Sequence, residues 1–136
     1  MSGRGACCVV LTALVASLSC AEQDEVILPP ARAGVLEPRW TIDGAADASL
    51  CAVHGVERMR IVVFDALGTI AATEFVPCSA FEASLTLPVD TYSGTAAFVA
   101  AGGAPVSRTL PLGSVQVHAE RTTRVAIAFT AEEMKR

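Results

Sequence analysis

The sequence predicts an all-β domain, a single small antiparallel β-sandwich of about seven strands, and three observations support that prediction. Short runs of residues alternate between apolar and polar side chains, which is the period of a half-buried strand. These runs recur about every ten residues, with glycine and proline between them. Only one short stretch has a helical pattern. The length of 136 residues also fits one domain.

The first expected elements lie between Trp40 and Gly55. Trp40 and Ile42 occupy alternate positions and open the first strand. Asp43 precedes a glycine and is expected to form a turn. Residues 47–54 have a helical pattern about two turns long, which Gly55 ends. We expect this helix to cross between the first two strands.

Four runs in the middle of the chain predict further strands. Residues 58–64 alternate apolar side chains with arginines, and the extended pattern resumes over 69–76 after a turn at 65–68. Residues 81–87 alternate between apolar and polar side chains, which predicts a half-buried strand. Residues 92–101 form a longer run of small and aromatic side chains, which two glycines close.

The last runs complete the sandwich. Residues 106–111 form a short strand, and 115–117 alternate two valines with a glutamine. Residues 119–123 are polar enough to turn, and alternation over 125–129 supplies the last strand. We therefore expect the domain to cover 39–130, followed by a solvated polar tail over 131–136.

The N-terminus has the parts of an export signal. Arg4 is the one charged side chain before an uncharged apolar run over 6–18. Small residues follow, and then an acidic stretch begins at Glu22. The run is shorter than the roughly 20 apolar residues that a membrane-spanning helix needs. We expect residues 1–19 to be a signal peptide.

Two cleavage sites remain open. In a bacterial lipoprotein signal, Cys20 becomes the first mature residue, and its thiol takes a diacylglyceryl group. Ser17 stands where the lipobox of such signals prefers leucine. In an ordinary secretory signal, Ser19, Cys20 and Ala21 satisfy the small-x-small rule, and cleavage falls before Glu22. The lipid reading places residues 20–38, which contain Pro29, Pro30 and Pro38, as a flexible tether to the membrane.

The cysteine count fits both readings. Of the five cysteines, Cys7 and Cys8 leave with the signal, and Cys20 is either lipidated or removed. Cys51 and Cys78 remain as a pair, which an oxidising compartment would join in one disulfide. Closing the loop of about 27 residues would contribute roughly 3.5 kcal/mol on the chain-entropy model.

Several of these residues together resemble a known family. They are Trp40-Thr41-Ile42-Asp43-Gly44, Cys51, Gly55, Val62-Val63, Pro77-Cys78, Leu87-Pro88, Tyr92, Gly103, Val125, Ile127 and Phe129. The pattern resembles small bacterial cell-envelope lipoproteins that combine a W-T-I-x-G start, two spaced cysteines and an L-P-x-x-x-Y strand. It is also similar to transthyretin-like, Ig-like and carboxypeptidase-regulatory-like sandwiches. Asp90 stands where such proteins often have glycine before the tyrosine strand. The resemblance implies an exported, lipid-anchored β domain without assigned catalytic residues.

A few residues are candidates for metal binding or catalysis. The spacing of Cys51 and His54 suits two zinc ligands, with Cys78 or His118 as additions, but a disulfide explains the thiols better. A histidine-dependent hydrolase would need His54 or His118 beside a carboxylate, and no Gly-x-Ser-x-Gly motif is present. We therefore expect no catalytic residue, no metal and no cofactor.

The remaining expectations concern partners and location. The net charge of −4 disfavours a nucleic-acid partner, which needs a basic face. Trp40 and Tyr92 could floor a groove for carbohydrate or peptide, although single strand aromatics are usually core residues. We expect a cell-envelope protein, lipid-anchored at the outer membrane and otherwise periplasmic or secreted, with an unidentified protein or glycan partner. The alternative is a soluble secreted ligand-binding module.

Overall fold

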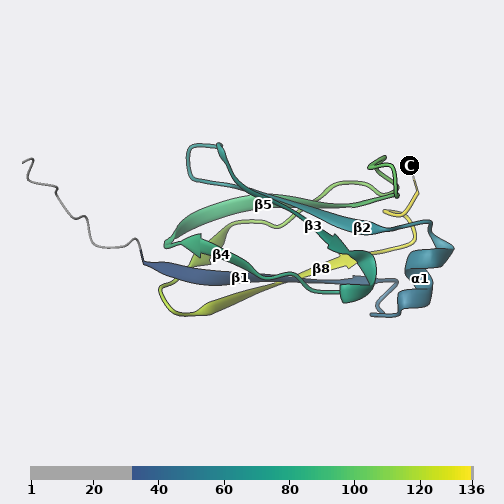
Figure 1. Cartoon of the computed structure of the whole chain (residues 1–136), viewed down its shortest axis with the longest axis horizontal. Coiled ribbons are helices and arrows are strands. Elements are labelled where there is room, and N and C mark those ends of the chain that lie inside the picture. Colours follow the sequence, from purple (N-terminus) through teal and green to yellow (C-terminus); the bar gives the residue numbers. More distant parts are fainter. Residues whose placement is uncertain (1–31, 136) are drawn as a thin grey trace, which may run out of the picture.

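The computed structural model describes residues 32–135, which form two β-sheets packed face to face (Figure 1). The first sheet has the strand order β4-β1-β8; the second has the order β3-β2-β5-β6, and β7 also pairs with β5. The strands are β1 (Ala33–Ile42), β2 (Arg58–Phe64), β3 (Ile70–Pro77), β4 (Leu85–Pro88), β5 (Asp90–Val99), β6 (Leu110–Pro111), β7 (Val115–Val117) and β8 (Thr122–Phe129). The helices are α1 (Ala48–Val53) and the short 3₁₀ helix η1 (Cys78–Ala80). The predicted all-β sandwich is confirmed, with eight strands among the described residues.

The core lies between the two sheets and follows from the alternation in the sequence. Met59, Ile61 and Val63 of β2 are fully buried on one face of that strand, as their spacing predicts. The rings of Phe98 in β5 and Phe129 in β8 pack across the sheets with centroids 4.4 Å apart. That distance and the tilt of 45° are typical of an attractive aromatic pair.

The turn between β2 and β3 is the predicted one. The Asp65 carboxylate accepts hydrogen bonds from the main-chain amides of Leu67 and Thr69, each at 2.9 Å. Gly68 has a φ of +79°, a conformation that side chains other than glycine rarely adopt. These features fix a tight hairpin, and Leu67 at its tip is 91% exposed.

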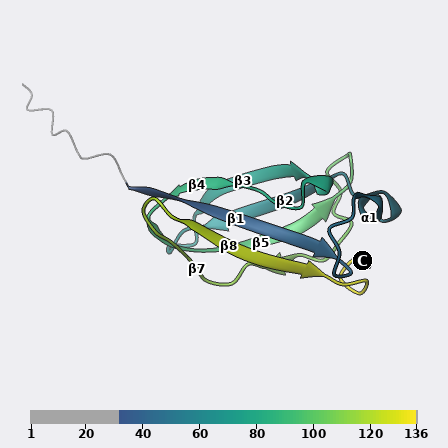
Figure 2. The same ribbon diagram turned by 90° about the horizontal axis from the view of Figure 1, so that it is seen from below.

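The sandwich is not wholly antiparallel, which corrects one prediction. β1 pairs with β8 in parallel, from Val35 opposite Thr122 to Ile42 opposite Phe129. Figure 2 shows β1 between β4 and β8, alongside both. Alternation reveals which face of a strand is buried but not the direction of its neighbour, so the sequence could not reveal this mixed sheet.

The predicted boundary between tether and domain at Arg39 is also wrong. β1 begins at Ala33, so residues 33–38 belong to the sandwich. Pro38 lies beyond the last β1–β4 pair, Leu36 opposite Leu85, so its missing N–H removes no bond from that ladder. A proline in the middle of β1 therefore suggested a tether. The predicted signal peptide, Cys20 and the rest of the tether lie outside the described residues.

The strand expected over 81–87 is shorter than predicted. Its burial alternates as expected, with Ala83, Leu85 and Leu87 buried. The strand β4 nevertheless begins only at Leu85, because η1 precedes it and Phe81 takes a left-handed conformation with φ +54°. An isolated bridge between Glu82 and Arg39 is all that pairs this stretch with β1.

The C-terminal residues are docked rather than a solvated tail, which is another correction. Met134 is 8% exposed and packs in the hydrophobic core. The Thr130 amide donates to the Glu133 carboxylate at 2.6 Å, and the Arg108 amide donates to the Glu133 carbonyl at 2.7 Å. The Thr130 hydroxyl also donates to this carboxylate, and the Glu133 amide donates to the Thr130 carbonyl at 3.1 Å, so these bonds fold this end into a turn.

The two ends of the sandwich differ. The end where β1 begins also carries the β2–β3 hairpin tip and the β7–β8 turn (Figure 1). The opposite end, here called the disulfide end, carries α1, η1 and the C-terminal turn. Within residues 32–135, no helix is long and apolar enough to cross a membrane.

Candidate functional site at the disulfide end

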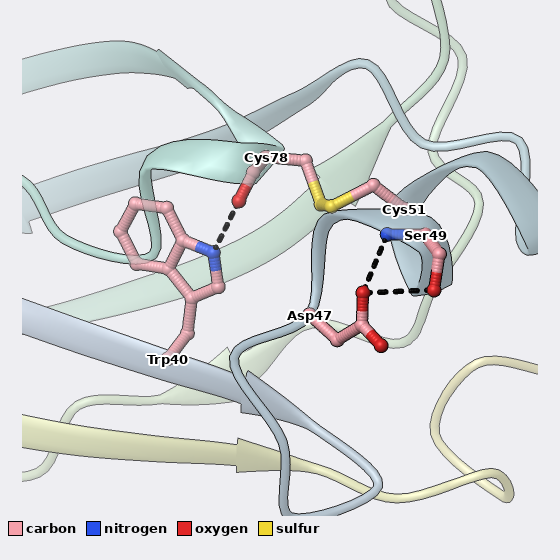
Figure 3. The surroundings of a disulfide bond; sticks show 5 residues. All are labelled: Trp40, Asp47, Ser49, Cys51 and Cys78. Carbon is pink, nitrogen blue, oxygen red and sulfur yellow. Dashed lines mark hydrogen bonds between the residues drawn. A yellow bond between two sulfur atoms is a disulfide. The ribbon is translucent and has the colours of Figure 1, made fainter.

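The short helix α1 forms where the sequence predicted it. Asp47 caps its start, and its carboxylate accepts hydrogen bonds from the Ser49 amide at 2.9 Å and the Ser49 hydroxyl at 2.8 Å (Figure 3). These bonds favour the ionised carboxylate and lower the pKa of Asp47. His54 ends the helix, and Gly55 follows with φ +65°. The cap sets where α1 begins and therefore the position of Cys51 within the helix.

The predicted disulfide between Cys51 and Cys78 is confirmed. It joins α1 to η1 and closes a separation of 27 residues (Figure 3). Both cysteines are buried, at 6% and 2% exposure. The Cys78 amide donates to the Glu57 carbonyl at 2.9 Å, which holds η1 against the start of β2. The disulfide thus links the β1–β2 connection, which contains α1, to the β3–β4 connection, which contains η1.

Trp40 is a core residue that supports this disulfide. Its indole Nε1 donates a hydrogen bond of 3.1 Å to the Cys78 carbonyl (Figure 3). The side chain is 1% exposed, so the ring cannot floor an open groove. The indole is large enough to fill the space between the sheets, and its polar atom has a partner, as buried tryptophans require.

Tyr92, the other candidate groove residue, is also buried. It lies at the start of β5 and is 4% exposed. Its hydroxyl donates to the Pro88 carbonyl at 2.7 Å. Burial raises the pKa of Tyr92, and the charges of Asp90 and Asp65 add to that increase. The two aromatic residues therefore support the core, as the more ordinary reading predicted.

The structure does not bring the candidate metal ligands together. Cys51 and Cys78 are joined to each other, and His54 ends α1 at the disulfide end. His118 follows β7, which pairs with the beginning of β5 at the opposite end. Among residues 32–135, no group of three or more histidine, cysteine, aspartate or glutamate side chains is placed to hold a metal ion.

An ion-pair cluster on the first sheet was not predicted. The Glu37 carboxylate lies 2.7 Å from an Arg39 nitrogen and 3.2 Å from Arg124 Nε. Burial alone would raise the pKa of Glu37, but the hydrogen bonds and charges of the two arginines lower it overall. Glu37 and Arg124 are 87 residues apart in sequence, so only the β1–β8 pairing could reveal the contact. Such exposed pairs contribute little to stability.

Comparison with known proteins finds remote structural similarities. No protein-family model matches the chain, and no curated protein matches it. Among solved structures, it is similar to a leucine-rich repeat protein from Bacteroides thetaiotaomicron, at 14% identity and a TM-score of 0.47, over 76% of this chain and 15% of that one. It is also similar to a proposed polysaccharide-binding protein from the same bacterium, at 15% identity and a TM-score of 0.44, over 68% and 46% of the two chains. A proposed adhesin from Bacteroides ovatus has 14% identity and a TM-score of 0.44, over 76% and 47%.

The chain spans less than half the length of each of these proteins. The resemblance to cell-envelope lipoproteins remains a prediction from the sequence.

Proposed function

We propose that this chain is an exported β-sandwich, lipid-anchored in the bacterial cell envelope, with a structural or binding role. The observation that carries this proposal is the buried disulfide between Cys51 and Cys78. Structural disulfides persist in oxidising compartments and are rare in the cytosol. An oxidised pair after an N-terminal export signal is consistent with a domain that leaves the cytoplasm.

The proposed anchor is Cys20, with a thioether-linked diacylglyceryl group and a further acyl chain such as palmitate on the freed amine. Two acyl chains are enough for stable membrane attachment, whereas one chain alone binds marginally. β1 begins at Ala33, at the end opposite the disulfide. A lipid at Cys20 would therefore join the end of the sandwich opposite α1, at the outer membrane in this proposal.

A structural or binding role is proposed instead of catalysis because of where the histidines lie. His54 ends α1 at one end of the sandwich, and His118 follows β7 at the other. A histidine-dependent hydrolase needs one histidine beside a carboxylate, and among residues 32–135 neither histidine forms an ion pair with one. We propose no metal, no cofactor and no nucleic-acid partner, consistent with the net charge of −4.

The alternative proposal is a soluble, secreted ligand-binding module for carbohydrate or peptide. It shares the export signal and the disulfide but places cleavage before Glu22, which removes Cys20. Because Trp40 and Tyr92 are buried, such a module would bind through other residues. The two proposals therefore differ in one measurable property, which is attachment to a membrane.

Detergent phase partitioning tests the proposal. The wild-type chain, with its own leader, is expressed in a bacterium. The Cys20→Ala variant and the double variant Cys51→Ser, Cys78→Ser are expressed in parallel. The wild-type chain is expected to partition into the detergent phase and to be labelled by radioactive palmitate. The Cys20→Ala variant is expected to remain unlabelled. The double variant is the matched control, because it loses two cysteines and should keep the lipid. An unlabelled wild-type chain in the aqueous phase would contradict the anchor and favour the soluble module.

A further inference from the structure

The outer face of the β2–β3 hairpin carries apolar side chains that no other described element covers completely. Ile70 and Phe75 of β3 are 59% and 49% exposed. Val62 and Phe64 of β2 are half-buried beside them. The outward positions of a sandwich strand are normally polar. Exposed apolar and aromatic residues that gather on one face often mark an interaction surface.

These residues lie in an ordered pattern of cross-strand pairs. Arg60 stands opposite Phe75 and Val62 opposite Thr73; after a register shift between Val63 and Phe64 that skips Ala71, Phe64 stands opposite Ile70. All six share the outer face, because the inward positions of β2 are the fully buried ones. We call these six residues the hairpin face. The Arg60–Phe75 and Phe64–Ile70 pairs lie on either side of the Val62–Thr73 pair, and each of these two outer pairs contains a phenylalanine.

The charges beyond the hairpin face have opposite signs. Arg58 lies at one end of β2, two residues beyond Arg60; its side chain is 53% exposed and its Nε lies 3.6 Å from the Glu57 carboxylate, so the two arginines outnumber one acidic group at this end. Asp65 follows Phe64 at the other end, in the hairpin turn. A half-turn about the line from Val62 to Thr73 would therefore superpose the Arg60–Phe75 pair on the Phe64–Ile70 pair. The same rotation would exchange the positive end with the negative end.

We propose that the hairpin face binds the same face of a second copy of this chain, with the strands antiparallel and the two-fold axis along the Val62–Thr73 pair. In this arrangement Phe75 of one copy packs against Ile70 of the other. Arg60 lies against the Phe64 ring, a contact that arginine makes favourably. Arg58 approaches Asp65 of the other copy. A two-fold interface needs such a self-complementary surface.

Charge excludes the simplest alternative packing of two hairpin faces. If the strands ran parallel with β2 stacked on β2, Arg58 and Arg60 would face the same residues of the other copy, and like charges would repel. Pairing of the two exposed β3 edges is disfavoured by Glu74. That residue stands opposite Ile61, on the inner face of an edge strand, and is exposed. A charge at an inward position of an edge strand is a known obstacle to strand addition.

The size of the hairpin face indicates a weak dimer. Two strands of about seven residues, at roughly 3.3 Å per residue and about 4.8 Å apart, cannot bury much more than about 1,000 Å² in total. Interfaces of that size are typically transient in solution. Attachment to one membrane would strengthen this dimer through effective concentration. That last point rests on the proposed function, whereas the dimer itself does not.

The test uses the full chain with Cys20→Ala, exported through its own leader and measured by sedimentation without detergent. We expect concentration-dependent dimers that Phe75→Glu or Ile70→Lys weakens by about tenfold or more, as at interface hot spots. Val89→Ser is the matched control, because Val89 is 46% exposed and lies outside the hairpin face. It should dimerise like the parent chain. Thermal melting confirms that each variant folds.

Mixing the two charged variants makes the test specific for the two-fold arrangement. A dimer of Phe75→Glu with Ile70→Lys would contain one intact Phe75–Ile70 contact and one new ion pair. We expect the mixture to regain dimers that neither variant forms alone. A monomeric parent chain at several hundred micromolar would overturn the proposal, as would unaffected variants or a mixture without recovery. Because the parent lacks Cys20, none of these results depends on lipidation.

Discussion

The indole nitrogen of Trp40, in β1, donates a hydrogen bond of 3.1 Å to the main-chain carbonyl of Cys78, which follows β3 in the opposite sheet. One contact therefore ties both sheets to the disulfide. The same carbonyl also accepts from the Phe81 amide at 3.3 Å, which closes η1. The hydrogen bond, the disulfide and the 3₁₀ turn form one connected support at this end of the sandwich.

Trp40→Phe is expected to lower the free energy of unfolding by about 1–3 kcal/mol, because it removes the indole hydrogen bond and leaves a small cavity. Urea denaturation measures the change. The same substitution in the Cys51→Ser, Cys78→Ser background gives a double-mutant cycle. We expect the loss to be smaller there, since η1 would be less fixed. Equal losses in both backgrounds would show that Trp40 and the disulfide act independently.

Removing the disulfide should lower stability by about 3.5 kcal/mol, the chain-entropy value for a loop of about 27 residues. The paired variant Cys51→Ser, Cys78→Ser is compared with the oxidised chain by thermal melting and denaturant titration. Reduction before electrophoresis should change the gel mobility of the oxidised wild-type chain and leave that of the paired variant unchanged. A wild-type chain with two reactive thiols would contradict the prediction.

Gly34→Ala is expected to destabilise the fold by about 2–4 kcal/mol, in the range of severe overpacking. A Cβ atom at this position would collide with the His118 carbonyl oxygen and approach Val117 Cγ1 to 2.9 Å. Gly102→Ala is the matched control, because nothing lies within 4 Å of the added atom. Urea titration of both variants provides the comparison. Equal stability of the two would contradict the close packing of β1 against the β7–β8 turn.

Stability should depend on pH through Glu133. The Thr130 hydroxyl and amide donate to its carboxylate and lower its pKa from the ordinary 4.5, and the Arg108 charge adds to that effect. The folded pKa is depressed, so this stabilisation is complete above pH 4.5 and is lost as the pH falls through the folded value. Glu133→Gln should therefore melt below wild type at pH 7, and the difference should shrink at pH 3.

Glu132→Gln controls for the loss of one negative charge in the same turn. Glu132 is exposed and pairs only with Lys135 among the described contacts, at 2.9 Å. We expect this variant to melt close to wild type at both pH values. A pH-independent difference for Glu133→Gln would show that its carboxylate is not held by Thr130 in solution.

Local patterns determined what the sequence could predict. Met59, Ile61 and Val63 alternate within one strand, and their burial follows from that spacing alone. The helix is bounded by Asp47 and Gly55, whose capping roles are local. The cysteine pair could be predicted because the proposed export signal would remove or lipidate the other three cysteines and leave Cys51 and Cys78 as the simplest partners. The disulfide end was therefore largely predictable.

What the sequence could not predict depends on partners distant in the chain. Pro38 suggested a tether, yet it is fully buried and lies opposite Val125 of β8, 87 residues further along the chain. The parallel pairing of β1 with β8 leaves no mark in the alternation of either strand. Met134 sits among charged residues, and its burial depends on the turn that Glu133 caps. Long-range pairing decided each of these features.

The mass of the mature N-terminal peptide from the membrane fraction tests the central claim most directly. The proposal predicts that the chain begins at Cys20 and that this peptide carries a diacylglyceryl group and a further acyl chain. An unmodified peptide that begins at Glu22 would contradict the lipid anchor and support a secreted module. A chain that keeps Met1 and its leader, with Cys51 and Cys78 as free thiols, would contradict export altogether.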